Sequence, residues 1–487
     1  MQLKKGDLIP VIIHKLAFGG AGLGECQISQ ELAEQKPWLK SISGIKIFVP
    51  DTIPGDQLLV SLTKIKSNRL EGKIHSFTKL SALRIEPRCQ HFPVCGGCVW
   101  QNIEYKNQLS YKQQQVQEAL AHLGNFPESE LLRIIKPIIL CNSPFEYRNK
   151  MEFSFGRSQE GKVMLGLHSP GMRHEVFDLK ECFLPSGIFA NLVEVVRDFA
   201  KKEKLEVYDD RTQDGLLKNL IIREGKNTGQ IMVNLVTSAN SFPAINRFKE
   251  LFKIGIWKDK IHSLLWTTVM QSRGVPTWRE SQVLVGKATI HEQLKLENGH
   301  KLDFEISAQS FFQPNTHQAE ILYAQVVKLA GLTGKEVVYD LYCGTGTIGL
   351  FCAHAAKKVY GIESVKEAIE NARANAKRNQ ISNAEFIIED VGKWLGDNQS
   401  NPQSIAPDVV VMDPPRAGLN PDIPQKIAHL KVPKIVYVSC NPATLARDLR
   451  LFYDLGYFPE IVQPVDMFPH TYHVETVVQL KKTKKDS

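Results

Sequence analysis

A cysteine closes an apolar run in the last third of the chain, where "KIVYVSC" (434–440) passes into the polar stretch "NPATLARDL". The carboxyl end of a core strand is where ligands meet an open α/β sheet. Most cysteines outside disulfides are simply small buried hydrophobes. Upstream, however, Asp413 opens the diproline turn "MDPPRAG", whose fixed backbone aims polar groups at the same edge. The pair of motifs favours Cys440 as a nucleophile.

Addition to carbon 6 of uracil is the chemistry that such a thiol suits. Enzymes that methylate exocyclic nitrogens carry an aromatic residue after a related diproline turn, but here that position is Arg416. Carbon 5 of uracil accepts a methyl group only after a thiolate has added to carbon 6, and a base must then remove the carbon 5 proton. Glu475 in "HVETVV" is the candidate base, since the final strands should flank the strand that ends at Cys440. The alternative is an ordinary polar strand residue.

A glycine loop indicates where the methyl donor binds. In "DLYCGTGTIGL" a strand ends near Asp340 and runs into Gly344 and Gly346. Such a loop fits a nucleotide-like ligand, and an acid at the end of the next strand can bind a ribose; Glu363 has that place, and Asp390 could lie beside the adenine. The loop alone also fits a dinucleotide. The carboxylate-rich rim favours the cationic S-adenosylmethionine.

A cysteine cluster, "CQHFPVCGGC", predicts a metal centre. Cys89, Cys95 and Cys98 lie close together without a second pair, whereas zinc modules usually show two pairs. Three clustered thiolates with one distant cysteine fit an iron–sulfur cluster better. On spacing alone, the fourth ligand is either Cys141 or Cys182.

The elements that position these residues predict an α/β protein of three domains. Residues 1–80 alternate short strands with glycine turns, typical of an OB-like β-barrel; "LAFGGAGLGE" is predicted as a turn and 27–44 as a loop insertion. Residues 81–305 form a mixed α+β domain with the cysteine cluster, and its helix 102–123 is a candidate to pack on the catalytic domain. Residues 306–487 alternate strands and helices, as in a doubly wound Rossmann-like sheet.

Composition fits an RNA-binding protein outside the membrane. The 487-residue chain has a net charge of +8. Between residues 60 and 88, seven Lys or Arg face two Glu, which suits contacts to a phosphate backbone but also an ordinary solvated face. No apolar run approaches the roughly 20 residues of a membrane helix, and the N-terminal apolar stretch is too short for a signal peptide. We expect a cytoplasmic protein with reduced or metal-bound cysteines.

The motifs as a set resemble the RNA uracil-5-methyltransferase family, and within it the 23S ribosomal-RNA branch with a TRAM domain and a [4Fe–4S] cluster. Nearly the whole chain is covered, in the family's order, by "CQHFPVCGGC", "YRNKMEFSFG", "SFFQPNT", "DLYCGTGTIGL", "MDPPRAGL", "VYVSCNPATLARDL" and "DMFPHTYHVETVV".

The resemblance implies roles for single residues. It makes Cys440 the nucleophile, Glu475 the base and Cys182 the fourth cluster ligand beside Cys89, Cys95 and Cys98. The positions that would contact S-adenosylmethionine are Gln313, Tyr342, Thr347, Glu363, Asp390 and Asp413. Of these, Gln313, Tyr342, Thr347 and the choice of Cys182 come from the resemblance alone.

The resemblance also implies the substrate. The transfer-RNA branch lacks barrel and cluster, so 23S ribosomal RNA is expected, with its target uridine unpaired or flipped out, and the protein is expected to be a monomer. Transfer RNA is the alternative substrate. Two other classes of protein compete with this interpretation: a metal-containing RNA-binding protein without catalysis, and a dinucleotide-dependent oxidoreductase.

Overall fold

The computed structural model describes residues 3–26, 44–66, 69–172, 175–238, 241–270, 277–399 and 405–482. The chain forms two compact units: Met1–Gln115 with Phe468–His473, and Val116–Met467 with Val474–Ser487. No helix in the described ranges is long and apolar enough to cross a membrane.

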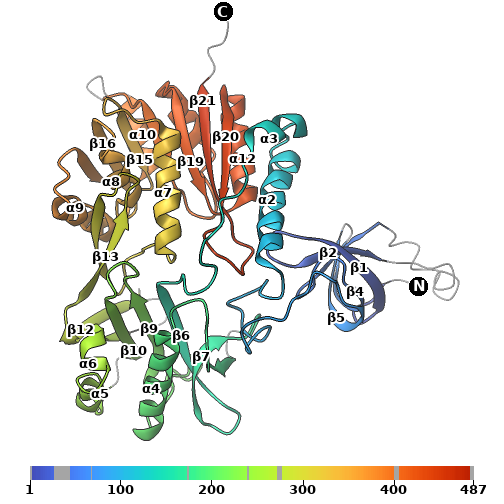
Figure 1. Ribbon diagram of the computed structural model, residues 1–487, viewed down its shortest axis with the longest axis vertical. Coiled ribbons are helices and arrows are strands. Elements are labelled where there is room, and N and C mark those ends of the chain that lie inside the picture. Colours follow the sequence, from blue (N-terminus) through green and yellow to red (C-terminus); the bar gives the residue numbers. More distant parts are fainter. Residues whose placement is uncertain are drawn as a thin grey trace, which may run out of the picture. The chain divides into compact units, whose positions relative to one another are not determined.

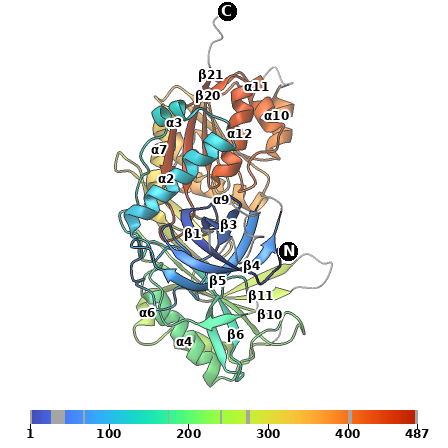
Figure 2. The same cartoon turned by 90° about the vertical axis from the view of Figure 1, so that its right-hand side faces the viewer.

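A closed five-stranded barrel dominates the first unit (Figure 2). Its strands pair in the order β1 (Leu8–Leu16), β2 (Gly22–Cys26), β3 (Lys46–Val49), β5 (Arg69–Lys79) and β4 (Gln57–Ile65). Buried and partly exposed residues alternate along β1 and β2, as a one-sided sheet requires. The small barrel expected at the N-terminus is thus present. The predicted insertion at 27–44 lies, apart from its last residue, outside the described residues.

The stretch "LAFGGAGLGE" was expected to be a turn, but the last four of its ten residues belong to strand β2. Glycine is needed inside this strand because neighbours approach closely: a Cβ on Gly24 would lie 2.3 Å from the Ile12 carbonyl oxygen, and one on Gly22 would lie 2.1 Å from Thr52 Oγ1. Glycines in a strand mark such close contacts as well as turns, so the sequence pattern alone was misleading here.

The segment after the barrel packs on it through buried Trp100 and Ile103. Helix α2 (Tyr105–His122) follows and matches the helix predicted at 102–123. In the first unit, α2 holds the segment Phe468–His473: Lys112 Nζ donates to the Phe468 carbonyl at 2.9 Å and Gln108 Oε1 accepts from the His470 amide at 2.9 Å. The residues just before Glu475 are therefore fixed by hydrogen bonds to a helix more than 350 positions earlier in the chain.

In the second unit, a seven-stranded sheet precedes the catalytic sheet (Figure 1). Its order is β12 (Trp278–Gly286), β11 (Ile261–Met270), β10 (Ile231–Ser238), β9 (Leu217–Glu224), β6 (Lys150–Arg157), β7 (Val163–His168) and β8 (Val176–Asp178). Helices α4 (Ile188–Lys202) and α5 (Ile245–Leu251) cover one apolar face. The short helix α6 (Trp257–Lys260) completes this part, whereas α3 (Glu128–Ile134) packs into the core of the catalytic sheet.

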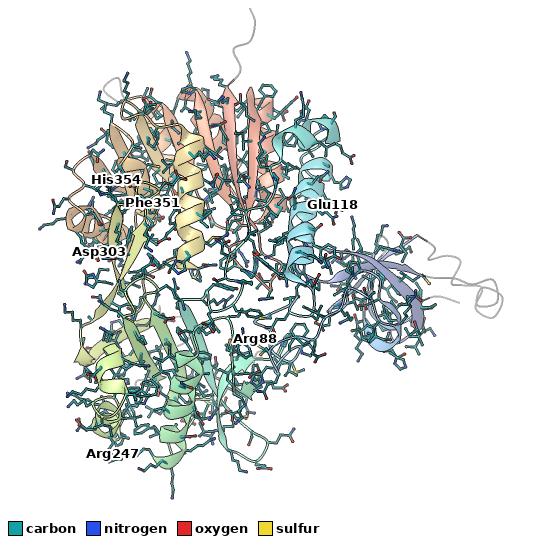
Figure 3. The ribbon with its side chains drawn as sticks, viewed as in Figure 1. Arg88, Glu118, Arg247, Asp303, Phe351 and His354 are labelled. Carbon is teal, nitrogen blue, oxygen red and sulfur yellow. The ribbon has the colours of Figure 1, made fainter. Side chains whose placement is uncertain are left out.

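A hairpin, β13 (Thr289–Lys295) with β14 (Lys301–Ser307), joins this sheet to the catalytic part. Asp303 on β14 (labelled in Figure 3) accepts from His291 Nδ1 at 2.7 Å and lies 3.6 Å from Arg378 Nε of helix α9 (Lys366–Arg378). The Asp303 amide donates to Asn379 Oδ1 at 2.7 Å. These polar contacts fix the hairpin on the catalytic part.

The catalytic sheet has seven strands in the order β17 (Ala384–Ile388), β16 (Lys358–Glu363), β15 (Val337–Leu341), β18 (Val409–Met412), β19 (Lys434–Ser439), β21 (Glu475–Lys482) and β20 (Tyr457–Val465). The first five are parallel, and β21 is antiparallel to both neighbours. This is the Rossmann-like sheet that the sequence predicted.

Helices flank this sheet on both sides. Its core cluster includes Val116 and Leu120 from the C-terminal half of α2, with residues of α10 (Val391–Gln399), α11 (Ile423–His429) and α12 (Pro442–Asp454). Helix α7 (Thr316–Ala330) crosses the front of the sheet in Figure 1 and packs against α8 (Thr347–Ala353).

Candidate active site

The pairing of β19 with β21 brings the candidate nucleophile and base together. Ser439 is paired with Thr476 across these antiparallel strands, so Cys440 and Glu475 are the next residue on each strand at one edge of the sheet. Cys440 is partly exposed, whereas Glu475 is only 5% exposed. The expectation that the final strands flank the strand of Cys440 agrees with this topology.

The thiol belongs to one electrostatic cluster with two carboxyl groups and a guanidinium. Burial raises the pKa of Cys440 to about 11, Glu475 and Asp413 add to the rise, and Arg416 opposes it partly through a hydrogen bond. Burial also raises the pKa of Glu475 to about 8, with the charge of Asp413 contributing. The pKa of Asp413 itself is raised by burial to about 7. A thiol, an arginine and acids of near-neutral pKa are the groups that nucleophilic and acid–base chemistry require.

Tyr323 on α7 also belongs to this cluster, although no sequence motif indicated a role for it. Its pKa is raised well above the usual value by burial and by the charges of Asp413, Glu475 and Asp340, while a hydrogen bond with Gln313 opposes the rise. The hydroxyl therefore lies among the acids that line the site. Tyr323 stands among the buried apolar residues Ala319, Leu322 and Val326 of α7, and a buried phenol normally needs a polar partner; that was the available signal.

A hydrogen-bond network built on Asp448 holds the diproline turn. This carboxylate is fully buried; its Oδ2 accepts from Tyr437 Oη at 2.6 Å and from the Leu419 amide at 2.8 Å. Arg447 donates to Asp448 Oδ1 at 2.8 Å and to the Leu419 carbonyl at 3.0 Å.

The start of α12 holds the same turn from its other side. Asn441 and Thr444 donate to the Arg416 carbonyl at 3.2 and 3.3 Å. The motif "NPATLARDL" thus fixes "MDPPRAGL" in place. The sequence showed the two motifs without this connection.

The glycine loop has the backbone of a ligand cradle at the end of β15. Tyr342, Gly344 and Gly346 have φ values of 62°, 53° and 76°, a region that costs energy for a non-glycine residue such as Tyr342. A Cβ on Gly346 would lie 2.7 Å from the Phe386 ring, while Gly344 faces open space. Helix α8 begins at Thr347, which is buried. This backbone leaves room for a ligand above the loop.

Acidic side chains ring this cradle. Glu363 Oε1 accepts from the Val365 amide at 3.0 Å and Asp390 Oδ1 accepts from the Lys393 amide at 2.9 Å, so each carboxylate is oriented at the start of a helix. Burial, then the charge of Asp390, raises the pKa of Tyr342 to about 12. The chemistry of this donor set fits a cationic nucleoside such as S-adenosylmethionine.

Asp340 lies beneath the loop and is fully buried. Neither of its carboxylate oxygens completes a hydrogen bond with another described residue. Burial raises its pKa to about 8, and the charges of Asp413 and Glu363 add to the rise. The Gly349 amide, which lies nearby without completing a hydrogen bond, lowers the pKa. Asp340 is therefore largely protonated near neutral pH.

The cysteine loop has amide donors beside its thiols. The Gly97 amide donates to Cys95 Sγ, and Gln101 Nε2 donates to Cys98 Sγ, both at 3.3 Å. Such hydrogen bonds are typical around thiolate-held clusters. Cys182 is partly exposed, while Cys141 is buried and donates to the Ser143 carbonyl.

The predicted cluster is nevertheless not confirmed. Within the described ranges, no three His, Cys, Asp or Glu side chains are grouped as they would be around a metal ion. The three clustered cysteines lie in the first unit and Cys182 lies in the second.

The fold and site define an S-adenosylmethionine-dependent methyltransferase, and comparison with known proteins gives the family. Residues 256–483 match the family described as tRNA (Uracil-5-)-methyltransferase. An uncharacterized RNA methyltransferase of Caldanaerobacter subterraneus is 37% identical over 99% of this chain and 100% of its own length. One from Bacteroides thetaiotaomicron is 39% identical over 92% of this chain and 100% of its own.

A solved structure agrees. The Pyrococcus abyssi tRNA (uracil-54, C5)-methyltransferase in complex with S-adenosyl-L-homocysteine is 27% identical, has a TM-score of 0.72, and covers 97% of this chain and 100% of its own. The chain belongs to the RNA uracil-5-methyltransferase family and is an RNA methyltransferase. Neither the oxidoreductase nor the non-catalytic alternative agrees with this membership.

We predict that Asp340→Asn changes stability in a pH-dependent way. The raised pKa of Asp340 means that the folded protein holds a proton that an unfolded aspartate, with a pKa near 4, has lost. This group's contribution to stability therefore declines as pH rises from about 4 through about 8. The neutral variant should melt higher than the wild type by a few degrees at pH 9, with a smaller difference at pH 6.

Thermal melts of the ligand-free protein across this pH range measure the effect. Asp422→Asn is the matched control, because Asp422 lies at the surface beside Lys426. A difference between wild type and Asp340→Asn that is the same at both pH values contradicts the proposed protonation of Asp340.

Proposed function

We propose that this protein transfers a methyl group from S-adenosylmethionine to carbon 5 of a uridine in RNA, through a covalent bond between Cys440 and carbon 6. The observation that carries this proposal is the register of β19 and β21, in which Cys440 and Glu475 follow the Ser439–Thr476 pair. The family membership supports the substrate class.

Each proposed step uses a named group. The Cys440 thiolate adds to carbon 6, and the electron pair of the 5,6 double bond moves into an enolate. Carbon 5 of the enolate takes the methyl group, which leaves the sulfonium as a neutral thioether. Glu475 then removes the carbon 5 proton, the double bond reforms, and the thiolate is expelled.

These steps require Cys440 and Glu475 in their ionised forms. Arg416 opposes the rise in the pKa of Cys440, and so favours the thiolate. Glu475 acts as a base only when ionised, and its pKa is raised to about 8. We therefore expect turnover to increase with pH through about 8.

For the methyl donor, we propose contacts from the residues of the glycine loop and its acidic rim. Glu363 would bind the ribose and Asp390 would lie at the adenine side, in keeping with their places at the ends of β16 and β17. The other proposed contacts are Gln313, Tyr342, Thr347 and Asp413. The hydrogen bond between Gln313 and Tyr323 supports a position for Gln313 beside the acids.

We predict that the two catalytic roles can be separated by trapping. Cys440→Ala should abolish both methylation and the covalent RNA complex. Glu475→Gln should form the complex with unmodified RNA and release it slowly, because the carbon 5 proton has no acceptor. RNA containing 5-fluorouridine should trap the wild type, since fluorine cannot leave as a proton. Denaturing gels and intact mass measure the complex.

Ser439→Ala is the matched control, one residue before the thiol, and should retain turnover. Methylation by Cys440→Ala would contradict the mechanism, because no other group on the proposed route can activate carbon 5.

For the substrate, we propose 23S ribosomal RNA with an unpaired or flipped-out uridine, and transfer RNA is the alternative. The basic segment from Lys64 to Arg88, on and beside β4 and β5, suits phosphate contacts, as a TRAM-like barrel would. The barrel does not separate the two substrates, however, because the match to the Pyrococcus abyssi tRNA (uracil-54, C5)-methyltransferase covers 97% of this chain. A monomeric, cytoplasmic enzyme is part of this proposal, since its thiols require a reducing compartment.

We predict that a strain without this protein loses 5-methyluridine from 23S ribosomal RNA and keeps it in transfer RNA. Nuclease digestion and mass spectrometry of both purified RNAs measure the modification, and re-expression of Cys440→Ala controls for loss of the protein itself. Loss from transfer RNA alone would favour the alternative substrate.

For the cysteine loop, we propose a [4Fe–4S] cluster held by Cys89, Cys95, Cys98 and Cys182. Amide donors to Cys95 Sγ and Cys98 Sγ support the loop as a ligand for a thiolate-held cluster. The cluster would stabilise the fold around the loop; the methyl-transfer steps do not involve it.

We predict that protein purified without oxygen is brown, with a broad absorption at about 400 nm and about four irons and four sulfides per chain. Cys98→Ser should lose this absorption, whereas Cys141→Ser should keep it. A colourless protein with one zinc would contradict the cluster.

A further inference from the structure

A large polar cavity lies on the sheet that contains β6, β9, β10 and β11, on the face opposite helices α4 and α5. The proposed mechanism does not use this cavity. Its volume is about 840 Å³, within the roughly 300–1,000 Å³ of ligand pockets. Alternation along β6 explains its polarity: Met151 and Phe153 face the apolar core, while Lys150, Glu152 and Ser154 line the cavity.

The cavity floor offers one amide donor that no described residue uses. Asn234 and Thr267 are 1% and 2% exposed. Thr267 Oγ1 lies 2.9 Å from Asn234 Oδ1, to which it donates, and 2.8 Å from Ser281 Oγ. Asn234 Nδ2 has no hydrogen-bond partner among the described side chains and backbone. A buried amide with a free donor is a means of recognising the polar edge of a base.

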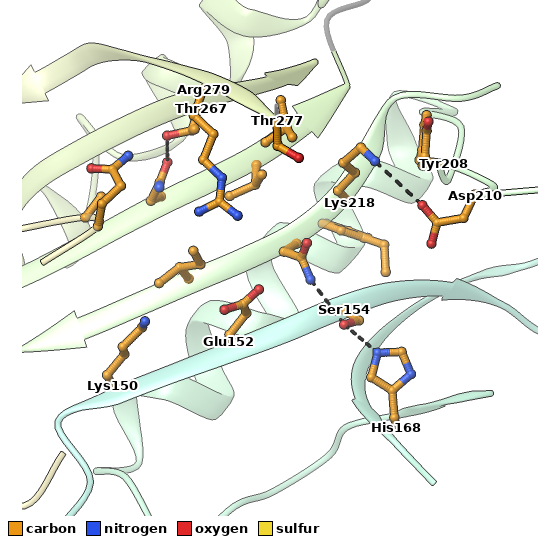
Figure 4. A pocket seen from close by; sticks show the side chains of 18 of the residues that line it. Lys150, Glu152, Ser154, His168, Tyr208, Asp210, Lys218, Thr267, Thr277 and Arg279 are labelled. Atoms are coloured by element: carbon orange, nitrogen blue, oxygen red, sulfur yellow. Dashed lines mark hydrogen bonds and ion pairs between the residues drawn. The ribbon is translucent and has the colours of Figure 1, made fainter. Parts of the chain in front are cut away.

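One side of the cavity carries an excess of positive charge. Arg279 and Lys150 (Figure 4) form no ion pair with another described residue. Burial lowers the pKa of Lys150, and the nearby charges of Arg223 and Arg279 lower it further, while Glu152 opposes them. Arg223 is buried and donates to the Ala308 and Ser310 carbonyls rather than to a carboxylate. An anion between Lys150 and Arg279 would relieve this repulsion.

The opposite side of the cavity carries the rings of Tyr208 and His168 and a lysine, Lys218, that already has interaction partners. Lys218 Nζ lies 3.3 Å from the Tyr208 ring centroid and 3.8 Å from Asp210. His168 Nε2 is 2.9 Å from Ser154 Oγ. Figure 4 shows this group across the cavity from Lys150 and Arg279. A ligand here would meet ring surfaces on one side and unbalanced positive charge on the other.

A short segment of the chain connects the cavity lining to the candidate active site. Ala308 and Gln309 line the cavity, and Gln313 follows four residues after Gln309. Four residues span at most about 14 Å, a distance that about four stacked nucleotides cover. Phe311, between the two sites, is 69% exposed. A single strand that enters the active site can therefore reach the cavity.

We infer that this cavity is a second nucleotide site, which takes an unpaired nucleotide of the same RNA with its phosphate between Lys150 and Arg279 and its base edge on Asn234. The inference rests on the proposed function. It adds a specificity determinant, since the RNA must present two extruded nucleotides at a fixed spacing.

Steady-state methylation of the RNA fragment that carries the mapped uridine tests the inference. Arg279→Gln should raise KM for this RNA on the order of tenfold and leave kcat and S-adenosylhomocysteine binding unchanged. The slope of log affinity against log salt concentration should become less steep by about one. Arg247→Gln, on helix α5 at the covered face (labelled in Figure 3), removes the same charge and should change none of these. Equal KM values for both variants would overturn the inference.

A cross-link identifies the nucleotide itself. RNA with 4-thiouridine at single non-target positions should cross-link to the peptide of β10 or β11 from one position only, and Asn234→Asp should reduce that cross-link in a protein with an unchanged melting temperature. Cross-links confined to other peptides would overturn the inference. It would also be overturned if uridine monophosphate bound at this cavity and the RNA did not compete with that binding. If the wild type methylates no RNA, the proposed function fails instead, whatever the cross-links show.

Discussion

The pairing of β19 with β21 is the constraint on which the candidate site depends. The two side chains that the chemistry needs are 35 positions apart in the sequence, and one pair of residues, Ser439 with Thr476, decides whether they meet. A slip of one residue would turn every side chain of β21 to the other face of the sheet. Core residues such as Val478 and Leu480 would then leave the apolar cluster in which they pack. Burial of this strand therefore fixes the register, and the register fixes the distance between thiol and carboxyl.

Electrostatics acts on the site thus assembled. Asp340, Asp413 and Glu475 lie in a poorly solvated volume, and burial raises the pKa of each to between about 7 and about 8. A cation beside buried acids lowers their pKa values. On the proposed assignment, Glu475 is thus a stronger acid while a sulfonium is present and a stronger base once that charge has been neutralised by methyl transfer. The order of the chemical steps is then favoured by the charge of the ligand itself.

Much of this arrangement was predictable from local pattern. Buried strands that end in a motif, such as β15 before the glycine loop and β19 before Cys440, are apolar runs of the expected length. Strand β20 does not show as an apolar run in the sequence because Pro459 and Pro464 interrupt it; it is an edge strand, where prolines are tolerated. The hydrogen-bond network built on Asp448 and the position of Tyr323 were not predictable, because both depend on contacts between segments that are distant in the sequence. Roles assigned from motifs thus stay predictions, while the fold that carries them is established.

The strand order has a consequence for synthesis on the ribosome. Strand β21 is made after β20, yet it lies between β19 and β20. Until residues through Lys482 have left the exit tunnel, β19 has an open edge with unpaired backbone groups, and β20 has no partner strand. N-terminal parts of a chain generally fold during translation, but this sheet can close only afterwards. The nascent polypeptide therefore passes through a stage in which the barrel can already fold and Cys440 still lacks Glu475, so that, on the proposed function, an unfinished chain binds RNA without completing its modification.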